Sequence, residues 1–427
     1  MSTPNPTRRT ILKTSSLMPL AGLLGLPSIS RAVEDAAASY RRPKLKITEI
    51  RTAEVRVHGY QVHVRVYTDQ GIVGQGESTD AAMGNVPLIR FFARFLTGQD
   101  PLNIEAAFEH IRTAGVFGGS QSGQYVAALT AVEIALWDIA GKALGLPVYQ
   151  LLGGRVRDAV RVYCDSGARE MIPGDEHSLA RIHQIQEMGF TAAKIDIDDA
   201  LDPARFDRVN WTANNGEIEH MLAKIAFARE HYPKNFDLAV DMHARYDAGT
   251  GKRVAKEVEP FKLLWLEEPV PPENIDAMRD IRASTATPIC CGENLYLRHG
   301  FRELLEKRAV DIIMPDFQKT GGLLEARKIA DMAHTYYVPV APHAVTSPIG
   351  MMATAQVCAA IPNFLVQEWH WIDSLDLWRN WVKEGEIIQK GFIRIPERAG
   401  IGVEMNEEGA RKAQVPGTPW FEPMQRG

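Results

Sequence analysis

The chain has 427 residues, of which 45% are hydrophobic and 24% are charged, the composition of an ordinary soluble globular protein. Its net charge is −5 and no stripe of basic residues is present, so nucleic acid is not an expected partner. The length is sufficient for a barrel of typical size together with a smaller domain.

Residues 1–32 contain no aspartate or glutamate and differ from the rest of the chain. They include the pair Arg8 and Arg9, which a mildly apolar stretch over 17–29 follows. This pattern is similar to a twin-arginine export signal, so residues 1–32 are predicted to be a signal peptide, with a linker over 33–43 after it. The protein is accordingly expected in the periplasm or outside the cell. The alternative is a basic N-terminus with a chance arginine pair. The apolar stretch is too short for a membrane span.

Residues 44–155 are expected to form one α+β domain. Three short segments at 46–57, 61–68 and 72–77 have the pattern of strands in a meander. A long helix is predicted over 125–144, because apolar residues recur on one of its faces and a glycine and a proline follow it.

Residues 156–385 alternate short apolar runs with helical segments, which is typical of parallel strands joined by helical crossovers. Eight runs fit a closed barrel better than an open sheet. They lie at 160–164, 192–197, 238–241, 263–267, 288–293, 311–316, 338–343 and 364–368. A C-terminal segment over 386–427, with one more strand at 391–396, is expected to pack back on the first domain.

Three acidic residues end consecutive runs, Asp241, Glu267 and Glu293, each 26 positions after the one before. The carboxyl ends of barrel strands meet on one rim, where catalytic residues lie. Clustered carboxylates repel one another, and a hard divalent cation removes that repulsion, so the spacing predicts a Mg²⁺ site. Glu268 could replace Glu267, which is preferred because it keeps the equal spacing. Alternatively, the three are separate surface or ion-paired acids.

Several further stretches together resemble the enolase superfamily, in its mandelate racemase/muconate lactonizing enzyme branch. They are AVEIALWD at 131–138, LLGG at 151–154, WLEEP at 265–269, GE at 292–293, PD at 315–316 with GG at 321–322, and PH at 342–343. The resemblance covers about residues 44–410. It implies an α/β fold, a TIM-like (β/α)₇β barrel with an N-terminal α+β capping domain, with Mg²⁺ held by three carboxylates and a homo-oligomeric assembly.

Within that branch the chain is similar to sugar-acid dehydratases of the galactonate and mannonate type. His243 follows the first metal ligand by two residues, His343 follows Asp316 by 27, and Glu368 follows His343 by 25. The resemblance implies an Asp316–His343 dyad and a Glu368 carboxylate that hydrogen-bonds the substrate. Racemases of the branch carry Lys-x-Lys where this chain has Lys194-Ile-Asp196, which argues against a two-base racemase.

The reaction class follows from these side chains. Removing a proton α to a carboxylate leaves an enediolate with two negative charges, which a divalent cation stabilises. His343 suits the base, because Asp316 can orient one ring nitrogen. His243 is the candidate acid that protonates a departing β-hydroxyl, so that an aldonate or aldarate would give a 2-keto-3-deoxy acid. Alternatively, His243 only binds the substrate, or His343 is a rim histidine without a role as base.

Three more residues are candidates for substrate binding. Lys194 contacts the substrate or serves as a counter-ion of the metal carboxylates. Asp196 belongs to the ligand shell or bonds Lys194. Arg245 grips a polyol or caps the next helix. Loops near 80–85 and 115–123 and an irregular insertion over 198–217 are expected to set the specificity, because long rim loops often do so.

Two other functions fit the same residues. An epimerase, racemase or cycloisomerase would use the same enolate but conserve the formula of the substrate. A protein of another class, a sugar-acid binding protein without catalysis, would show neither reaction. A small-molecule sugar acid is the expected partner in every case.

Overall fold

The computed structural model describes residues 42–79, 82–166 and 171–423. The predicted signal over 1–32 and most of the predicted linker lie outside these residues. Residues 45–427 group into one compact unit, to which the following description applies. Within the described ranges, no helix combines the length and the apolar character that a membrane crossing requires.

The N-terminal part of this unit is a three-stranded antiparallel sheet covered by helices. The strands pair in the order β1-β2-β3. The elements are β1 (Ile47–Val55), β2 (Gln61–Thr68), β3 (Val73–Ser78), α2 (Asn85–Leu96), α3 (Ile104–Ala114) and α4 (Gly123–Leu144). Helix α4 lies directly on β3, because Gly74 and Gly76 carry no side chain: a Cβ there would lie 2.0 and 1.9 Å from the carbonyl oxygens of Ala135 and Ala131. The predicted strands and helix are confirmed.

Seven strands of the second part form a parallel sheet in the order β10-β4-β5-β6-β7-β8-β9. They are β4 (Ala159–Asp165), β5 (Ala192–Asp196), β6 (Asp237–Asp241), β7 (Leu266–Glu267), β8 (Ile289–Cys291), β9 (Ile312–Ile313) and β10 (Gln367–His370). Val340 closes the ring, because it bridges in parallel to Ile313 on one side and to Phe364, just before β10, on the other. All eight predicted runs therefore contribute to the barrel.

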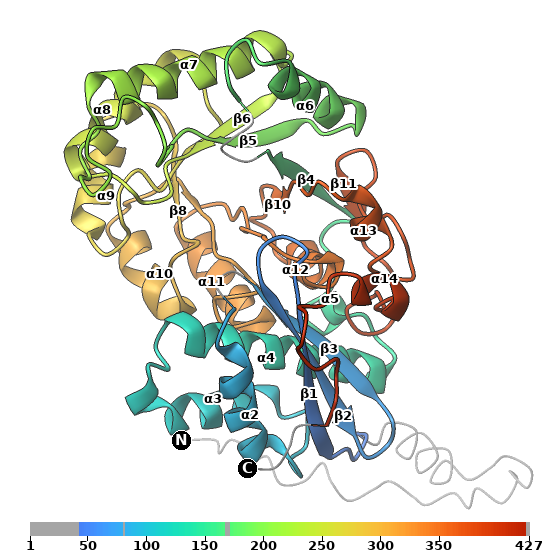
Figure 1. The fold of residues 1–427 in the computed structure, drawn as a ribbon. Coiled ribbons are helices and arrows are strands. Elements are labelled where there is room, and N and C mark those ends of the chain that lie inside the picture. The colour runs from blue at the N-terminus through green and yellow to red at the C-terminus, as the bar shows by residue number, and fades with distance from the viewer. Residues whose placement is uncertain (1–41, 80–81, 167–170, 424–427) are drawn as a thin grey trace, which may run out of the picture. The chain divides into compact units, whose positions relative to one another are not determined.

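Seven helices connect these strands and follow one another around the ring (Figure 1). They are α6 (Glu176–Glu187), α7 (Asn215–His231), α8 (Ala248–Glu257), α9 (Ile275–Arg282), α10 (Leu297–Glu306), α11 (Leu323–Thr335) and α12 (Pro348–Ala360). The last barrel strand, β10, is followed by the short α13 (Leu375–Arg379) in place of a further long barrel helix. Seven βα units and a final strand give the predicted (β/α)₇β arrangement.

The C-terminal segment contacts both parts. Strand β11 (Phe392–Arg394) is the strand that was predicted at 391–396, and it pairs antiparallel with the barrel strand β4. Later residues reach the N-terminal sheet, since Gln414 and Trp420 bridge to β1. A last short helix, α14 (Glu407–Arg411), lies between these contacts along the chain.

Two buried carboxylates of the N-terminal part bind the first turns of barrel helices. Glu77, in β3, accepts hydrogen bonds from the backbone N–H groups of Ser347 (2.8 Å) and Gly350 (3.0 Å) at the start of α12. Glu133, in α4, accepts from the N–H groups of Leu323 (2.8 Å) and Leu324 (3.1 Å) at the start of α11. A carboxylate satisfies the unpaired N–H groups at a helix start and suits its partial positive charge.

These two carboxylates predict a pH-dependent stability. Burial raises the pKa of Glu77 and of Glu133 to about 7 from 4.5, although the hydrogen bonds from the helix starts oppose it. Between pH 4.5 and 7 the folded state then holds protons that the unfolded state has lost. The contribution of these two groups to the free energy of unfolding should therefore be greatest below pH 4.5 and fall as the pH rises through 7, by up to about 3 kcal/mol for each group.

Urea denaturation at pH 5 and pH 8 measures this fall. In the Glu133→Gln variant the difference between the two pH values should be smaller than in the wild type. An unchanged difference would mean that the Glu133 carboxyl is already ionised at pH 5 in the folded protein.

Candidate active site

The three equally spaced acids lie together at the carboxyl ends of neighbouring strands. Asp241 ends β6, Glu267 ends β7 and Glu293 follows β8. One carboxylate oxygen from each lies within 4.8 Å of the others, and all three side chains are buried. Two effects raise the pKa of Glu267 well above its usual value. The larger is burial, and the smaller is the negative charge of Asp241. The three acids are therefore neither separate nor on the surface, although they do form ion pairs with Lys194 and His343, as the alternative allowed.

Glu268 points to a different set of partners. Its Oε1 accepts a hydrogen bond from the backbone of Gly292 (3.3 Å), and its Oε2 accepts from Asn294 Nδ2 (2.6 Å). It does not belong to the group that Glu267 forms with Asp241 and Glu293. The preference for Glu267 over Glu268 therefore agrees with the geometry.

Lys194, in β5, is buried among carboxylates. Its Nζ lies 3.1 Å from Asp241 Oδ2, 3.1 Å from Glu267 Oε2, 3.0 Å from Glu368 Oε1 and 3.4 Å from Asp165 Oδ2. Burial disfavours its ammonium, but the carboxylates of Glu267 and Glu368 outweigh burial and raise the pKa of Lys194 well above normal. Of the two predicted roles, the arrangement supports the counter-ion.

His343 and Asp316 form the predicted pair. His343 Nδ1 lies 2.7 Å from Asp316 Oδ2, and Asp316 Oδ1 accepts from the Gln318 N–H at 2.7 Å. The other ring nitrogen, Nε2, lies 2.9 Å from Glu293 Oε2 and 3.8 Å from Glu368 Oε2. Burial disfavours the charged ring, but Glu368 and Glu293 outweigh it and hold the pKa of His343 well above 6.5.

Glu368 lies in β10, between the lysine and the histidine. Its Oε2 accepts a hydrogen bond from the backbone of Ala344 at 2.9 Å. Burial alone would raise the pKa of this carboxyl, but the positive charges of Lys194 and His343 lower it below its usual value. Glu368 is therefore an ionised acceptor beside the other charged groups.

His243 lies on the opposite flank of the carboxylate group. Its Nδ1 is 2.7 Å from Asp198 Oδ1, whereas its Nε2 is 3.8 Å from Asp241 Oδ2 and 3.9 Å from Asp196 Oδ1. Burial disfavours the charged ring, but the Asp241 carboxylate and the hydrogen bond to Asp198 raise the pKa of His243 to about 11. The backbone at His243 has φ of 49°, and its N–H donates to Asp241 Oδ1 at 2.7 Å.

The two remaining candidates have different surroundings. Asp196 is buried, its Oδ1 has no hydrogen-bond partner in the described part of the chain, and Lys194 forms no ion pair with it, so the suggested bond between these two residues is wrong. Together with Asp241 and His243 it forms a second group of possible metal ligands. Arg245 is half exposed and donates to Asp198 Oδ2, rather than capping a helix.

Two residues of the site were not predicted, Asp165 and Asp198. Asp165 ends β4 and lies beside Lys194, and Asp198 follows β5 and binds His243. Each directly follows an apolar run, at 160–164 and 192–197, so the rule that found the metal carboxylates would also have found them.

The loops expected to set specificity are only partly described. Residues 80–81 lie outside the described ranges, and Phe117 in the 115–123 segment is fully exposed. The insertion over 198–217 is irregular up to α7, and Arg205 anchors it by contacts with Glu217 (3.8 Å) and with the Tyr246 ring (5.6 Å). Their role in specificity stays a prediction.

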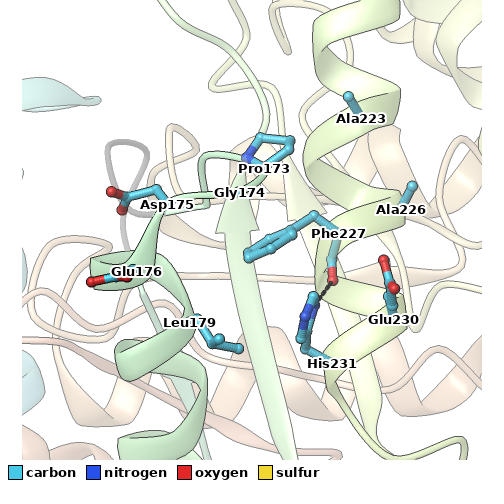
Figure 2. Close-up of a pocket in the computed structure, with 10 residues that line it drawn as sticks. All are labelled: Pro173, Gly174, Asp175, Glu176, Leu179, Ala223, Ala226, Phe227, Glu230 and His231. Atoms are coloured by element: carbon cyan, nitrogen blue, oxygen red, sulfur yellow. Dashed lines mark hydrogen bonds between the residues drawn. The ribbon is translucent and has the colours of Figure 1, made fainter.

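A separate pocket of about 510 Å³ lies between α6 and α7 (Figure 2). Leu179, Phe227 and His231 are among its lining residues, and the His231 ring bonds the Phe227 carbonyl inside it. None of the candidate catalytic, substrate-binding or metal-ligating residues lines this pocket. It is therefore not part of the candidate active site.

Comparisons with known proteins agree with this arrangement. Residues 39–153 match the mandelate racemase/muconate lactonizing enzyme N-terminal domain, and residues 178–409 match the enolase C-terminal domain-like family. The chain belongs to the mandelate racemase/muconate lactonizing enzyme branch of the enolase superfamily. The predicted family and fold class are thus confirmed.

Individual members of the branch are similar to this chain along most of their length. The D-xylonate dehydratase of Haloferax volcanii is 41% identical over 377 residues, which cover 88% of this chain and 91% of the relative. The D-galactonate dehydratase of Pectobacterium atrosepticum is 31% identical, covering 90% and 98%. A mandelate racemase/muconate lactonizing enzyme-like protein from Rubrobacter xylanophilus has a solved structure with a TM-score of 0.83 and 42% identity, covering 90% and 100%. The named relatives confirm the prediction of an enzyme of the hydro-lyase class.

Proposed function

We propose that this protein dehydrates a sugar acid, an aldonate or aldarate, to a 2-keto-3-deoxy acid. The observation that carries the proposal is the placement of two histidines on the two flanks of one carboxylate group. His343 Nε2 lies beside Glu293, and His243 Nε2 lies beside Asp241. An elimination needs a base and an acid, whereas α-proton exchange by one base needs no second group. The xylonate and galactonate dehydratases among the relatives support this substrate class.

We propose Mg²⁺ as the cofactor, held by Asp241, Glu267 and Glu293. The donor set fits, because it consists of three converging carboxylate oxygens, and Mg²⁺ prefers oxygen ligands. The second group, with Asp196 and His243, includes a ring nitrogen and suits softer divalent metals better. A bound Mg²⁺ supplies Lewis-acid stabilisation of the negative charge that develops on the substrate carboxylate.

His343 is the proposed base. Asp316 on Nδ1 favours the tautomer that leaves the Nε2 lone pair free to accept a proton. The carboxylate of Glu293 raises the pKa of His343, and positive charge beside Glu293 would offset this effect and return the pKa toward the working pH. Glu368 and Lys194 are fixed opposite charges beside this group, and the ionised Glu368 can accept a hydrogen bond from a hydroxyl of the substrate.

The steps balance as an elimination of water. His343 takes the proton from the α-carbon, and the electron pair left behind forms the Cα–Cβ double bond as the Cβ–O bond breaks. His243 gives a proton to the departing hydroxyl, which leaves as water. The resulting enol tautomerises to the keto acid. Asp196 has an oxygen without a partner and is placed to accept a hydrogen bond from a sugar hydroxyl.

Incubation in D₂O with Mg²⁺ and a panel of aldonic and aldaric acids, including D-xylonate and D-galactonate, tests the function. Keto acid from one or a few substrates is the expected result. Deuterium incorporation at the α-carbon without keto acid would instead identify an epimerase, racemase or cycloisomerase. A substrate-dependent rise in the melting temperature with neither reaction would identify a binding protein.

A further inference from the structure

Asp198 is a buried carboxylate that uses its two oxygens separately. It is 1% exposed and lies just after β5. Its Oδ1 is 2.7 Å from His243 Nδ1, and its Oδ2 accepts from Arg245 Nη1. Burial would raise its pKa, but the bonds from His243 and the charge of Arg245 lower it, so the group is ionised.

The bond to Asp198 decides which ring nitrogen of His243 faces the reacting groups. With Nδ1 occupied, Nε2 is directed to Asp241 and Asp196, at 3.8 and 3.9 Å. The side chain is 29% exposed, so it is not enclosed by packing, and the bond to Asp198 selects one of its staggered rotamers. A carboxylate on one nitrogen of a histidine fixes both the tautomer and the ring orientation.

The same arrangement exists at the proposed base. Asp316 binds Nδ1 of His343 at 2.7 Å and leaves Nε2 beside Glu293. Two Asp–His pairs therefore present their Nε2 atoms to one carboxylate group from two sides. An ion pair with Arg245 needs only one oxygen of Asp198. It does not account for the second oxygen, which binds His243.

We propose that Asp198 is a positioning residue for the elimination step, which holds the Nε2–H of His243 toward the departing β-hydroxyl. This inference rests on the proposed function. Proton abstraction by His343 does not involve Asp198, so loss of Asp198 should slow loss of water and spare the removal of the α-proton. These two steps can be measured separately.

The test compares wild type with Asp198→Asn in D₂O, using the panel acid that the wild type dehydrates. The ratio of α-deuterium in recovered substrate to keto acid formed should rise at least about tenfold, because a proton is still removed while water leaves more slowly. The 3-deoxy-3-fluoro analogue of the same acid should release fluoride at nearly the wild-type rate, because fluoride departs with less help from an acid.

Asp237→Asn is the matched control. Asp237 starts β6, at the other end of that strand from Asp241, and accepts a hydrogen bond from Arg161 Nη2 at 2.8 Å. This variant should keep the wild-type ratio. Asp198→Ala is measured in parallel, since it removes the carboxylate without adding an amide donor, and circular dichroism and the melting temperature show whether each variant is folded.

Three results would overturn the inference. Asp198 variants that keep the wild-type ratio show that His243 is positioned without it. Equal losses of exchange, dehydration and fluoride release in a folded variant show that Asp198 supports the whole site rather than one step. A wild type that dehydrates no panel acid contradicts the proposed function itself, a result distinct from any failure of the Asp198 variants.

Discussion

Replacing His343 with asparagine should lower kcat for keto acid formation by about 10²–10⁴-fold and abolish deuterium exchange at the α-carbon. Its Nε2 is the nitrogen that faces Glu293 and Glu368 at 2.9 and 3.8 Å, and an amide cannot accept the proton. The fold should persist, because the asparagine amide can still donate to Asp316. Steady-state kinetics and proton NMR in D₂O measure both effects.

The His243→Gln variant should differ from His343→Asn in its deuterium exchange. Loss of the proposed acid should slow dehydration while exchange continues, whereas loss of the proposed base should stop both. Exchange at the wild-type rate in His343→Asn would assign the base elsewhere. Lys194 would then be the next candidate, since it is the other buried cationic group beside Glu368.

Removal of the metal should abolish activity, and added Mg²⁺ should restore it. The three carboxylates that converge within 4.8 Å are the proposed ligands, so Glu267→Gln should weaken Mg²⁺ binding by more than the 10–100-fold that is typical of changes outside the ligand set. Isothermal titration of the chelator-treated protein with Mg²⁺ measures this without reference to any substrate.

Glu268→Gln is the matched control for the metal prediction. The two glutamates are adjacent in sequence and both buried, but Glu268 bonds Gly292 and Asn294 instead of joining the carboxylate group. Its substitution should change Mg²⁺ affinity much less than that of Glu267. Equal effects, or a larger effect at Glu268, would contradict the assignment of the ligands.

The clustering of the three carboxylates could be predicted because barrel geometry converts sequence spacing into position. Asp241 and Glu267 end β6 and β7, and Glu293 follows β8, in consecutive βα units of equal length, so equal spacing places them side by side. The rule that acids after an apolar run gather on one rim also holds for Asp165 and Asp198, which follow the first two runs. The barrel itself follows from the eight alternating runs.

Other features depend on side-chain positions that no pattern in one sequence encodes. Lys194 forms ion pairs with four carboxylates from different strands, and its role as a counter-ion becomes visible only when those strands lie together. The pairing of β11 with β4 is similar, because a three-residue strand far along the chain could pair with any exposed edge.

The bonds from Glu77 and Glu133 to the starts of α12 and α11 mean that neither part of the enzyme is a self-sufficient module. An N-terminal fragment expressed alone would expose both carboxylates to water, and an isolated barrel would leave two helix starts without partners. Those helices follow the segments that carry His343 and Asp316. Exchanging N-terminal domains between members of the branch would therefore also exchange the carboxylates that bind the starts of the two helices next to the proposed base.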